Sequence, residues 1–159
     1  MPRRIKISFE RGGEVTATLL EDEAPQTCEV VWRQLPITSE AVHTRWCGRE
    51  VNWAVDFGRR PPRENQTITS SVGNVVYWRE WEGLYPSTGA EALGVYYGAE
   101  LIRDHRGHQP VNVFAQVDTS SWNLLREVGY RVWRQGAERV TVTRLERVED
   151  ETPGGDNDG

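Results

Sequence analysis

The sequence has few cysteines and no long apolar run. No apolar stretch approaches the roughly 20 residues that a membrane-spanning helix needs, so we expect no membrane partner. The two cysteines, Cys28 and Cys47, have neither metal-ligand spacing nor the pattern of a disulfide framework. This cysteine usage, together with the lack of an apolar leader after Met1, predicts a reduced cytoplasmic protein.

Recognisable catalytic motifs are also missing. The chain contains no glycine-rich phosphate loop and no Ser, Cys or Thr nucleophile motif. His105 and His108 lie in a glycine-containing loop and lack both the helical i, i+4 spacing and the carboxylate partner typical of zinc sites. We therefore expect neither a metal nor a cofactor.

Charge is concentrated at one end of the chain. The net charge is −5, and residues 149–159 carry five acids and no base, which leaves residues 1–148 electrically neutral. A neutral body lacks the basic face that nucleic-acid binding needs, so we expect no nucleic-acid partner. The terminal acids, glycines and proline cannot bury enough apolar surface to fold. These features predict one domain over residues 1–148 and an acidic disordered tail over residues 149–159.

Short runs of alternating apolar and polar residues dominate the chain and predict β-strands. The predicted strands cover Arg4–Phe9, Val15–Leu19, Ala41–Trp46, Val51–Val55, Asn74–Trp81, Leu93–Tyr97, Val111–Val117 and Glu138–Leu145. Two helices are predicted, one beginning at Pro25 and one carrying Trp122, Leu125 and Val128. About eight strands with two short helices predict a mainly β fold, a closed antiparallel β-barrel with a helix at each end.

The order of these elements resembles a cyclophilin. The acid-rich turn Glu21–Thr27 ends in Pro-x-Thr, as the turn before the first cyclophilin helix does. Val113–Val117 resembles the Val-Phe-Gly-Lys-Val strand near the cyclophilin active site, and Arg45 matches the position of the catalytic arginine. The resemblance implies a cyclophilin-like barrel.

The prolyl-isomerase residues of that family are replaced in this chain. Glu50 and Trp53 occupy the positions of the family's phenylalanine and glutamine, Val111 replaces the histidine, and the Gln-Gly-Gly-Asp signature is missing. Isomerisation needs a desolvated apolar pocket beside an arginine donor, and a carboxylate there is poorly suited to it. Classical prolyl-isomerase activity is therefore not expected.

A better resemblance is to uncharacterised bacterial cyclophilin-like proteins, a domain-of-unknown-function family that shares the barrel but not the isomerase motif. The matching features are Trp46–Glu50, Glu64-Asn65, Tyr97-Gly98 and Asn112–Ala115. The resemblance covers residues 4–147 and implies a fold with little settled chemistry.

Three charged residues flank predicted strand ends, and we expect them at a pocket in the barrel mouth. These candidate catalytic residues are Arg45, Glu50 and Glu64. An arginine can clamp a carboxylate or an amide carbonyl, and a glutamate among aromatic residues has its pKa raised towards that of a general base at neutral pH. A solvated charge pair is the alternative interpretation.

Aromatic residues are abundant on the predicted strands, and the chain has seven tryptophans. Most are expected to pack in the core, but alternation sends adjacent residues to opposite faces, so one of each pair can line a concavity. An aromatic wall with a few polar groups is typical of small-molecule pockets. The expected ligand-binding residues are Trp46, Trp53, Asn65, Tyr77, Tyr97, Asn112 and Phe114. For the two asparagines, turn capping is an equal alternative.

The sequence thus predicts a barrel that binds a small polar, nitrogen-containing molecule, either an amide, a lactam or a carboxylate. If the protein is an enzyme, Glu50 or Glu64 would be the general base in hydrolysis or isomerisation of an amide-like group. An atypical prolyl isomerase and a non-catalytic binding module or complex subunit remain open alternatives. Exposed barrel edges leave self-association into a homo-oligomer open as well.

Overall fold

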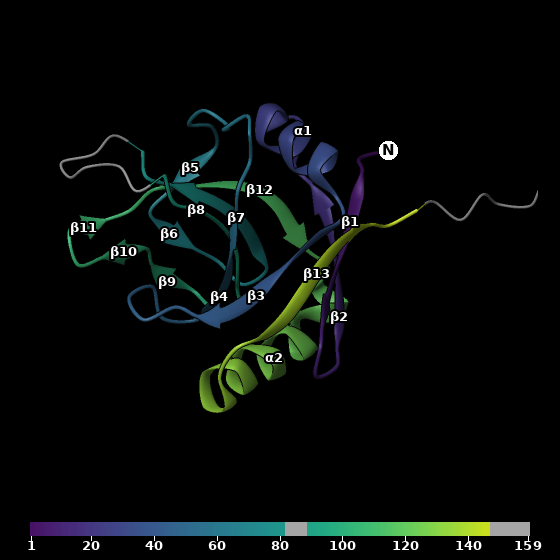
Figure 1. Ribbon diagram of the computed structural model, residues 1–159, viewed down its shortest axis with the longest axis vertical. Coiled ribbons are helices and arrows are strands. Elements are labelled where there is room, and N and C mark those ends of the chain that lie inside the picture. Colours follow the sequence, from purple (N-terminus) through teal and green to yellow (C-terminus); the bar gives the residue numbers. More distant parts are fainter. Residues whose placement is uncertain (82–88, 147–159) are drawn as a thin grey trace, which may run out of the picture.

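The computed structural model describes residues 1–81 and 89–146 (Figure 1). The expected acidic tail, residues 149–159, lies outside the described residues. Eight long strands form one antiparallel sheet in the order β2-β1-β13-β3-β4-β8-β7-β12, and β12 pairs back with β2 to close it. The predicted closed antiparallel barrel with two helices is therefore confirmed.

The barrel strands are β1 (Arg4–Phe9), β2 (Glu14–Leu19), β3 (Ile37–His43), β4 (Glu50–Val55), β7 (Asn74–Arg79), β8 (Glu91–Tyr96), β12 (Val111–Val117) and β13 (Glu138–Arg144). The short strands are β5 (Gln66–Thr67), β6 (Thr69–Ser70), β9 (Glu100–Leu101), β10 (Arg103–Asp104) and β11 (Gly107–His108). The helices are α1 (Pro25–Gln34), the 3₁₀ turn Thr119–Ser121 and α2 (Trp122–Gln135).

The two α-helices lie at opposite ends of the barrel (Figure 1). Pro25 suits the first turn of α1 because the missing N–H has no partner there anyway, and Cys28 and Val31 on one face are buried. In α2, Leu125, Val128 and Val132 form the buried stripe. Each helix therefore covers the apolar barrel interior with an amphipathic face. No helix among the described residues is long and apolar enough to span a membrane.

Apolar side chains pack on both faces of one barrel wall. The main core fills the interior and includes Val51, Trp53 and Val95. A second cluster on the opposite face contains Val76, Tyr96, Ile102, Val111 and Val113. The β6–β9 and β10–β11 ribbons lie against this outer face, and Ile102 joins them there. This second layer creates the space in which the candidate site lies.

One barrel strand lies several residues before its predicted position. The strand expected at Ala41–Trp46 is β3, which begins at Ile37 and ends at His43. Only Ala41 in β3 is fully buried, so apolar alternation is too weak to reveal the strand's first half. Arg45 and Trp46 consequently lie in the loop between β3 and β4.

Candidate functional site

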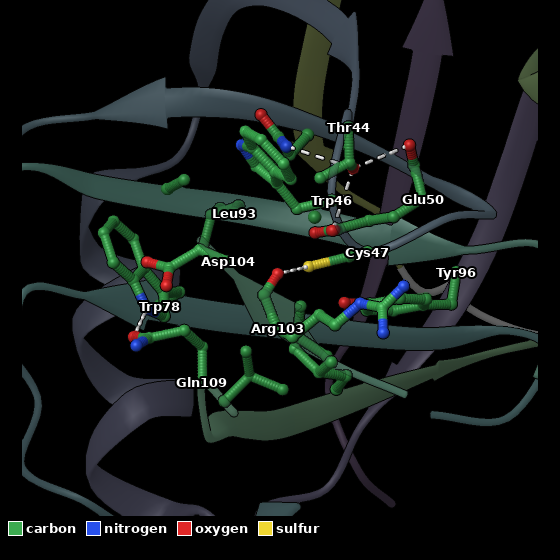
Figure 2. Close-up of a pocket in the computed structure, with 16 residues that line it drawn as sticks. Thr44, Trp46, Cys47, Glu50, Trp78, Leu93, Tyr96, Arg103, Asp104 and Gln109 are labelled. Atoms are coloured by element: carbon green, nitrogen blue, oxygen red, sulfur yellow. Dashed lines mark hydrogen bonds between the residues drawn. The ribbon is translucent and has the colours of Figure 1, made fainter. Parts of the chain in front are cut away.

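A cavity of about 160 Å³ opens on the outer face of the barrel wall, and we call it the Glu50 pocket (Figure 2). Strands β4, β7 and β8 form its floor, and the segment around β10 covers it. The apolar walls come from Val76, Trp78, Ala92, Ile102 and Val111. The polar groups that reach the pocket come from the β3–β4 loop, from β4 and β8, and from the segment around β10.

Strand register brings the polar groups of the pocket together. Glu50 pairs with Tyr96 and Asn52 pairs with Gly94 across the antiparallel β4–β8 ladder. Because alternate residues share a face, all four lie on the outer surface of the sheet, whereas Val51 points into the barrel core. The site is therefore a consequence of one strand pairing.

Gly94 provides the space that the Glu50 carboxyl group occupies. A β-carbon at position 94 would lie 2.2 Å from Glu50 Oε1, far inside contact distance. Only glycine at this position lets the carboxyl group lie over the β8 backbone without displacement.

The Glu50 carboxyl group is buried with little compensation. The residue is 7% exposed, and the Thr44 hydroxyl shares its one proton between Glu50 Oε2 and the Glu50 backbone carbonyl, each 2.9 Å away. The Asn52 amide in turn donates to the Thr44 hydroxyl at 3.3 Å. Within residues 1–81 and 89–146, no arginine, lysine or histidine pairs with Glu50.

Burial raises the pKa of Glu50 to about 7, because removal from water disfavours the ionised form. The Thr44 hydroxyl, the Tyr96 hydroxyl and the Cys47 thiol partly oppose this rise by stabilising the charge. Both protonation states are consequently populated near neutral pH. A group with this balance can take a proton from a bound molecule and return it.

Cys47 lies beside Glu50 but lacks the features of an activated nucleophile. Its thiol donates to the Arg103 carbonyl at 2.9 Å, and burial raises its pKa to about 11. The thiolate is the reactive form, so a thiol that stays protonated at neutral pH is chemically quiet. The arrangement therefore favours proton transfer over covalent catalysis.

The mouth of the pocket is more polar than its base. Trp46 is 56% exposed there, with its ring centroid 6.2 Å from that of His105. Asp104 forms a 2.6 Å ion pair with Arg106, which fixes the β10–β11 ribbon. The Trp78 indole donates to the Gln109 side chain at 3.1 Å and so holds one wall in place. In the described part of the chain, no group of three or more His, Cys, Asp or Glu residues is arranged to hold a metal.

Two of the predicted site residues, Glu50 and Trp46, meet in this pocket. Arg45 and Tyr97 instead line a separate, more open depression of about 740 Å³, the aromatic groove, together with His43, Tyr130 and Trp133. Tyr97 Oη lies 2.6 Å from His43 Nε2. The structure therefore separates Arg45 from Glu50.

Three other predicted site residues hold the chain together near α1. The Glu64 carboxylate accepts a hydrogen bond from the backbone N–H of Thr27, in the first turn of α1. Asn112 is fully buried, and its amide donates to Thr27 Oγ1 at 3.0 Å and to the Pro62 carbonyl at 2.8 Å. The Asn65 amide donates to the Val113 carbonyl at 2.8 Å. These contacts join β12 to α1 and to the segment before β5.

The remaining predicted residues pack in the barrel core. Trp53 and Phe114 are 0% exposed, and the Tyr77 hydroxyl donates to the buried Glu91 at 2.5 Å. None of the three lines the Glu50 pocket.

Sequence reasoning missed four residues at the centre of the site. They are Thr44, Asn52, Gly94 and Tyr96. Alternation indicates that one ring of the adjacent Tyr96 and Tyr97 lines a concavity; the predicted residue is Tyr97, whereas the residue that lines the Glu50 pocket is Tyr96.

The fold has structural counterparts of low sequence identity. McbB, whose structure was solved in complex with tryptophan, matches with a TM-score of 0.70 and 22% identity over 92% of this chain; the match covers 46% of McbB, so the chain spans about half its length. A hypothetical protein from Archaeoglobus fulgidus matches with a TM-score of 0.59 and 23% identity, covering 91% of this chain and 95% of that one.

A cyclophilin-type peptidyl-prolyl cis-trans isomerase from Cryptosporidium parvum matches with a TM-score of 0.51 and 10% identity, covering 92% of this chain and 99% of the isomerase. All three likenesses concern the fold alone. In sequence, a family described as a protein of unknown function, DUF3830, matches residues 7–144. No curated protein matches.

Proposed function

The chain belongs to the DUF3830 family of proteins of unknown function, on a cyclophilin-like barrel, and from this premise we propose that the Glu50 pocket binds a small nitrogen-containing molecule and moves a proton on it. The resemblance to an uncharacterised cyclophilin-like family is thereby confirmed. The observation that carries the proposal is a buried carboxyl group at the base of an apolar pocket, with no cationic partner among the described residues.

A buried carboxyl group without a counter-charge destabilises the folded protein. Burial without a counter-charge destabilises its ionised form, and proteins usually avoid the arrangement unless it has a use. Strongly perturbed carboxyl groups in concave sites are typical of functional sites. Glu50 is both buried, with no counter-charge in the described part of the chain, and located in a concave site. Glu64 instead accepts a hydrogen bond from the first turn of α1.

The pocket volume limits the ligand to about one ring. A protein cavity of about 150 Å³ holds a benzene molecule. The Glu50 pocket, at about 160 Å³, therefore accommodates a five- or six-membered ring, and any larger part of the ligand extends into the mouth beside Trp46. McbB, whose structure was solved in complex with tryptophan, is a fold relative whose ligand is also a nitrogen-containing ring compound, and this supports the same ligand chemistry here.

The same volume favours isomerisation over hydrolysis. Hydrolysis needs a water beside the ring, and a cavity filled by one ring has no room for both. In isomerisation, the Glu50 carboxylate takes a proton from one atom of the ligand and returns it to another while a double bond shifts. Atoms and charges balance within the ligand, so no second reactant is required.

Binding is tested by a thermal-shift screen of lactams, cyclic imides, small amides, carboxylates and proline peptides. A ligand at about 100 times its dissociation constant stabilises the folded state by about 2.7 kcal/mol. We expect a shift from ring-containing amides with the wild type and with Glu127→Gln, which removes an exposed carboxylate on α2. If Glu50→Gln loses the thermal shift, the ligand binds in the Glu50 pocket. If Arg45→Ala loses the shift and Glu50→Gln keeps it, the ligand binds in the aromatic groove instead.

Turnover is tested separately by hydrogen exchange of the bound ligand. In D₂O, proton transfer by Glu50 should place deuterium on the ligand carbon that exchanges, visible by NMR. Binding without enzyme-dependent exchange would identify a non-catalytic binding module. A response to proline peptides alone would favour an atypical prolyl isomerase.

A further inference from the structure

Tyr96 carries an unsatisfied hydroxyl group inside the Glu50 pocket. The residue is 0% exposed, and Tyr96 Oη has no hydrogen-bond partner among the described residues. Buried polar groups in native proteins are nearly always hydrogen-bonded, so an orphaned hydroxyl in a cavity points to a missing partner. Figure 2 shows the Tyr96 side chain running inward towards Cys47 and the centre of the pocket.

Neighbouring groups do not supply that partner. Besides burial, which raises the pKa of the Tyr96 hydroxyl most, the Glu50 carboxyl group and the Cys47 thiol lie near enough to raise it further through weak hydrogen bonding, but neither contact has the distance and angle of a full hydrogen bond. The Glu50 carboxyl group accepts from Thr44, and the Cys47 thiol donates to Arg103. A ligand oxygen in the pocket can therefore compete successfully for the Tyr96 proton.

We propose that Tyr96 and Glu50 together recognise a cyclic amide, with Tyr96 donating to the ligand's carbonyl oxygen and Glu50 accepting from its N–H. This inference rests on the proposed function and narrows its substrate class. Glu50 and Tyr96 are direct cross-strand partners, so their side chains leave adjacent points of the same sheet face. They therefore present one acceptor and one donor side by side.

Amide geometry selects the ring form. An open-chain secondary amide is trans, so its N–H and C=O point to opposite sides and cannot both meet this pair. A five- or six-membered lactam ring forces the cis arrangement and places both groups on one edge. Its remaining carbons match the apolar walls and the single-ring volume of the pocket.

Tyr96 also serves the proposed proton transfer. Burial raises the pKa of Tyr96, so the hydroxyl keeps its proton and acts as a donor. A hydrogen bond to the carbonyl oxygen stabilises the negative charge that develops there as Glu50 removes the proton. Tyr96 would then both select the ligand and assist the reaction.

Four small compounds distinguish the hydrogen bond to Tyr96 from the hydrogen bond to Glu50, when binding is measured by calorimetry at pH 8. They are 2-pyrrolidinone, N-methyl-2-pyrrolidinone, pyrrole and N-methylacetamide. We expect 2-pyrrolidinone to bind wild type most tightly, with at least a tenfold loss for its N-methyl form and for the trans amide. Loss of one neutral hydrogen bond corresponds to about tenfold in affinity.

The Tyr96→Phe variant tests the assigned donor. Its affinity for 2-pyrrolidinone should fall about tenfold. Its affinity for pyrrole, which has an N–H but no carbonyl, should not change. Tyr130→Phe, which removes a hydroxyl from the exposed side of α2, should change neither. Because Tyr96→Phe removes a group without a partner, its thermal midpoint should be no lower than that of wild type.

Each failure has a different signature. Lactam binding that depends on Glu50 but is unchanged in Tyr96→Phe would overturn this inference and leave the proposed function standing. Equal affinity for 2-pyrrolidinone and N-methylacetamide would overturn the cyclic-amide assignment. No binding of any compound would overturn both. A lower midpoint for Tyr96→Phe would show that the hydroxyl is already satisfied in the free protein, which removes the premise.

Discussion

Replacement of Glu50 by glutamine should stabilise the protein at alkaline pH. The pKa of Glu50 rises from its ordinary value of 4.5 to about 7 on folding, chiefly through burial. The folded state therefore holds this proton more tightly than the unfolded state does. Stability should fall as the pH rises from about 4.5 through 7, because the folded protein must then bury an ionised carboxylate. Glutamine fits the same space without the charge.

The size of the effect follows from the same values. A pKa raised from 4.5 to about 7 corresponds to about 3 kcal/mol of lost stability once the group is fully ionised, at about 1.4 kcal/mol per pKa unit. For a domain of this size, that is a rise of roughly 6–12 °C in the midpoint of Glu50→Gln over wild type at pH 9. The difference should vanish at pH 4, where both states of the wild type are protonated.

Denaturant unfolding from pH 4 to pH 9 measures this difference directly. Other titrating groups contribute equally to both proteins and cancel in the comparison. Glu127→Gln, on the exposed side of α2, should follow wild type within about 0.5 kcal/mol across the range. A stability difference between Glu50→Gln and wild type that is flat with pH, or one that grows towards acid, would show that the pKa of Glu50 is not raised in the folded protein.

Three further substitutions test the supports of the site. Gly94→Ala would put a β-carbon 2.2 Å from the Glu50 carboxyl group, so it should cost about 1–3 kcal/mol in denaturant unfolding and abolish ligand-induced thermal shifts. Asn112→Ala removes four hydrogen bonds beside α1 and should cost about 3 kcal/mol, with ligand affinity per folded molecule unchanged by calorimetry. Glu138→Gln leaves two arginines without their buried carboxylate and should cost about 3 kcal/mol at pH 7. Although burial opposes ionisation of Glu138, hydrogen bonds from those arginines lower its pKa, so unfolding curves of variant and wild type should converge below pH 4.5.

The sequence predicts the barrel well where strands bury one face. The strand predicted at Arg4–Phe9 matches β1 at both ends because its buried and partly exposed residues alternate strictly. Pro25 and the apolar stripe likewise predict α1. The two-residue ribbons β6–β9 and β10–β11 escape detection because two residues are too few to show a period.

The candidate site is less predictable because it depends on strand register. Glu50 is identifiable as a charge at a strand end, but its partner depends on which of Tyr96 and Tyr97 faces outward. A single-residue shift reverses that answer. The position of Arg45 is also hard to predict. Because β3 ends at His43, Arg45 lies in the following loop and lines the aromatic groove.

Long-range capping is invisible in the sequence. The Glu64 carboxylate bonds to Thr27, 37 positions earlier, and Asn112 reaches the same residue from β12. Nothing local distinguishes these side chains from ligand-binding ones. Their role becomes apparent only when the barrel brings them to α1.

The decisive experiment is a crystal structure of the protein with 2-pyrrolidinone. We expect the ring in the Glu50 pocket against Trp78, with its N–H on Glu50 and its carbonyl oxygen on the Tyr96 hydroxyl. A ring bound instead in the aromatic groove beside Tyr97 and Trp133, or an empty Glu50 pocket at saturating lactam, would contradict this expectation.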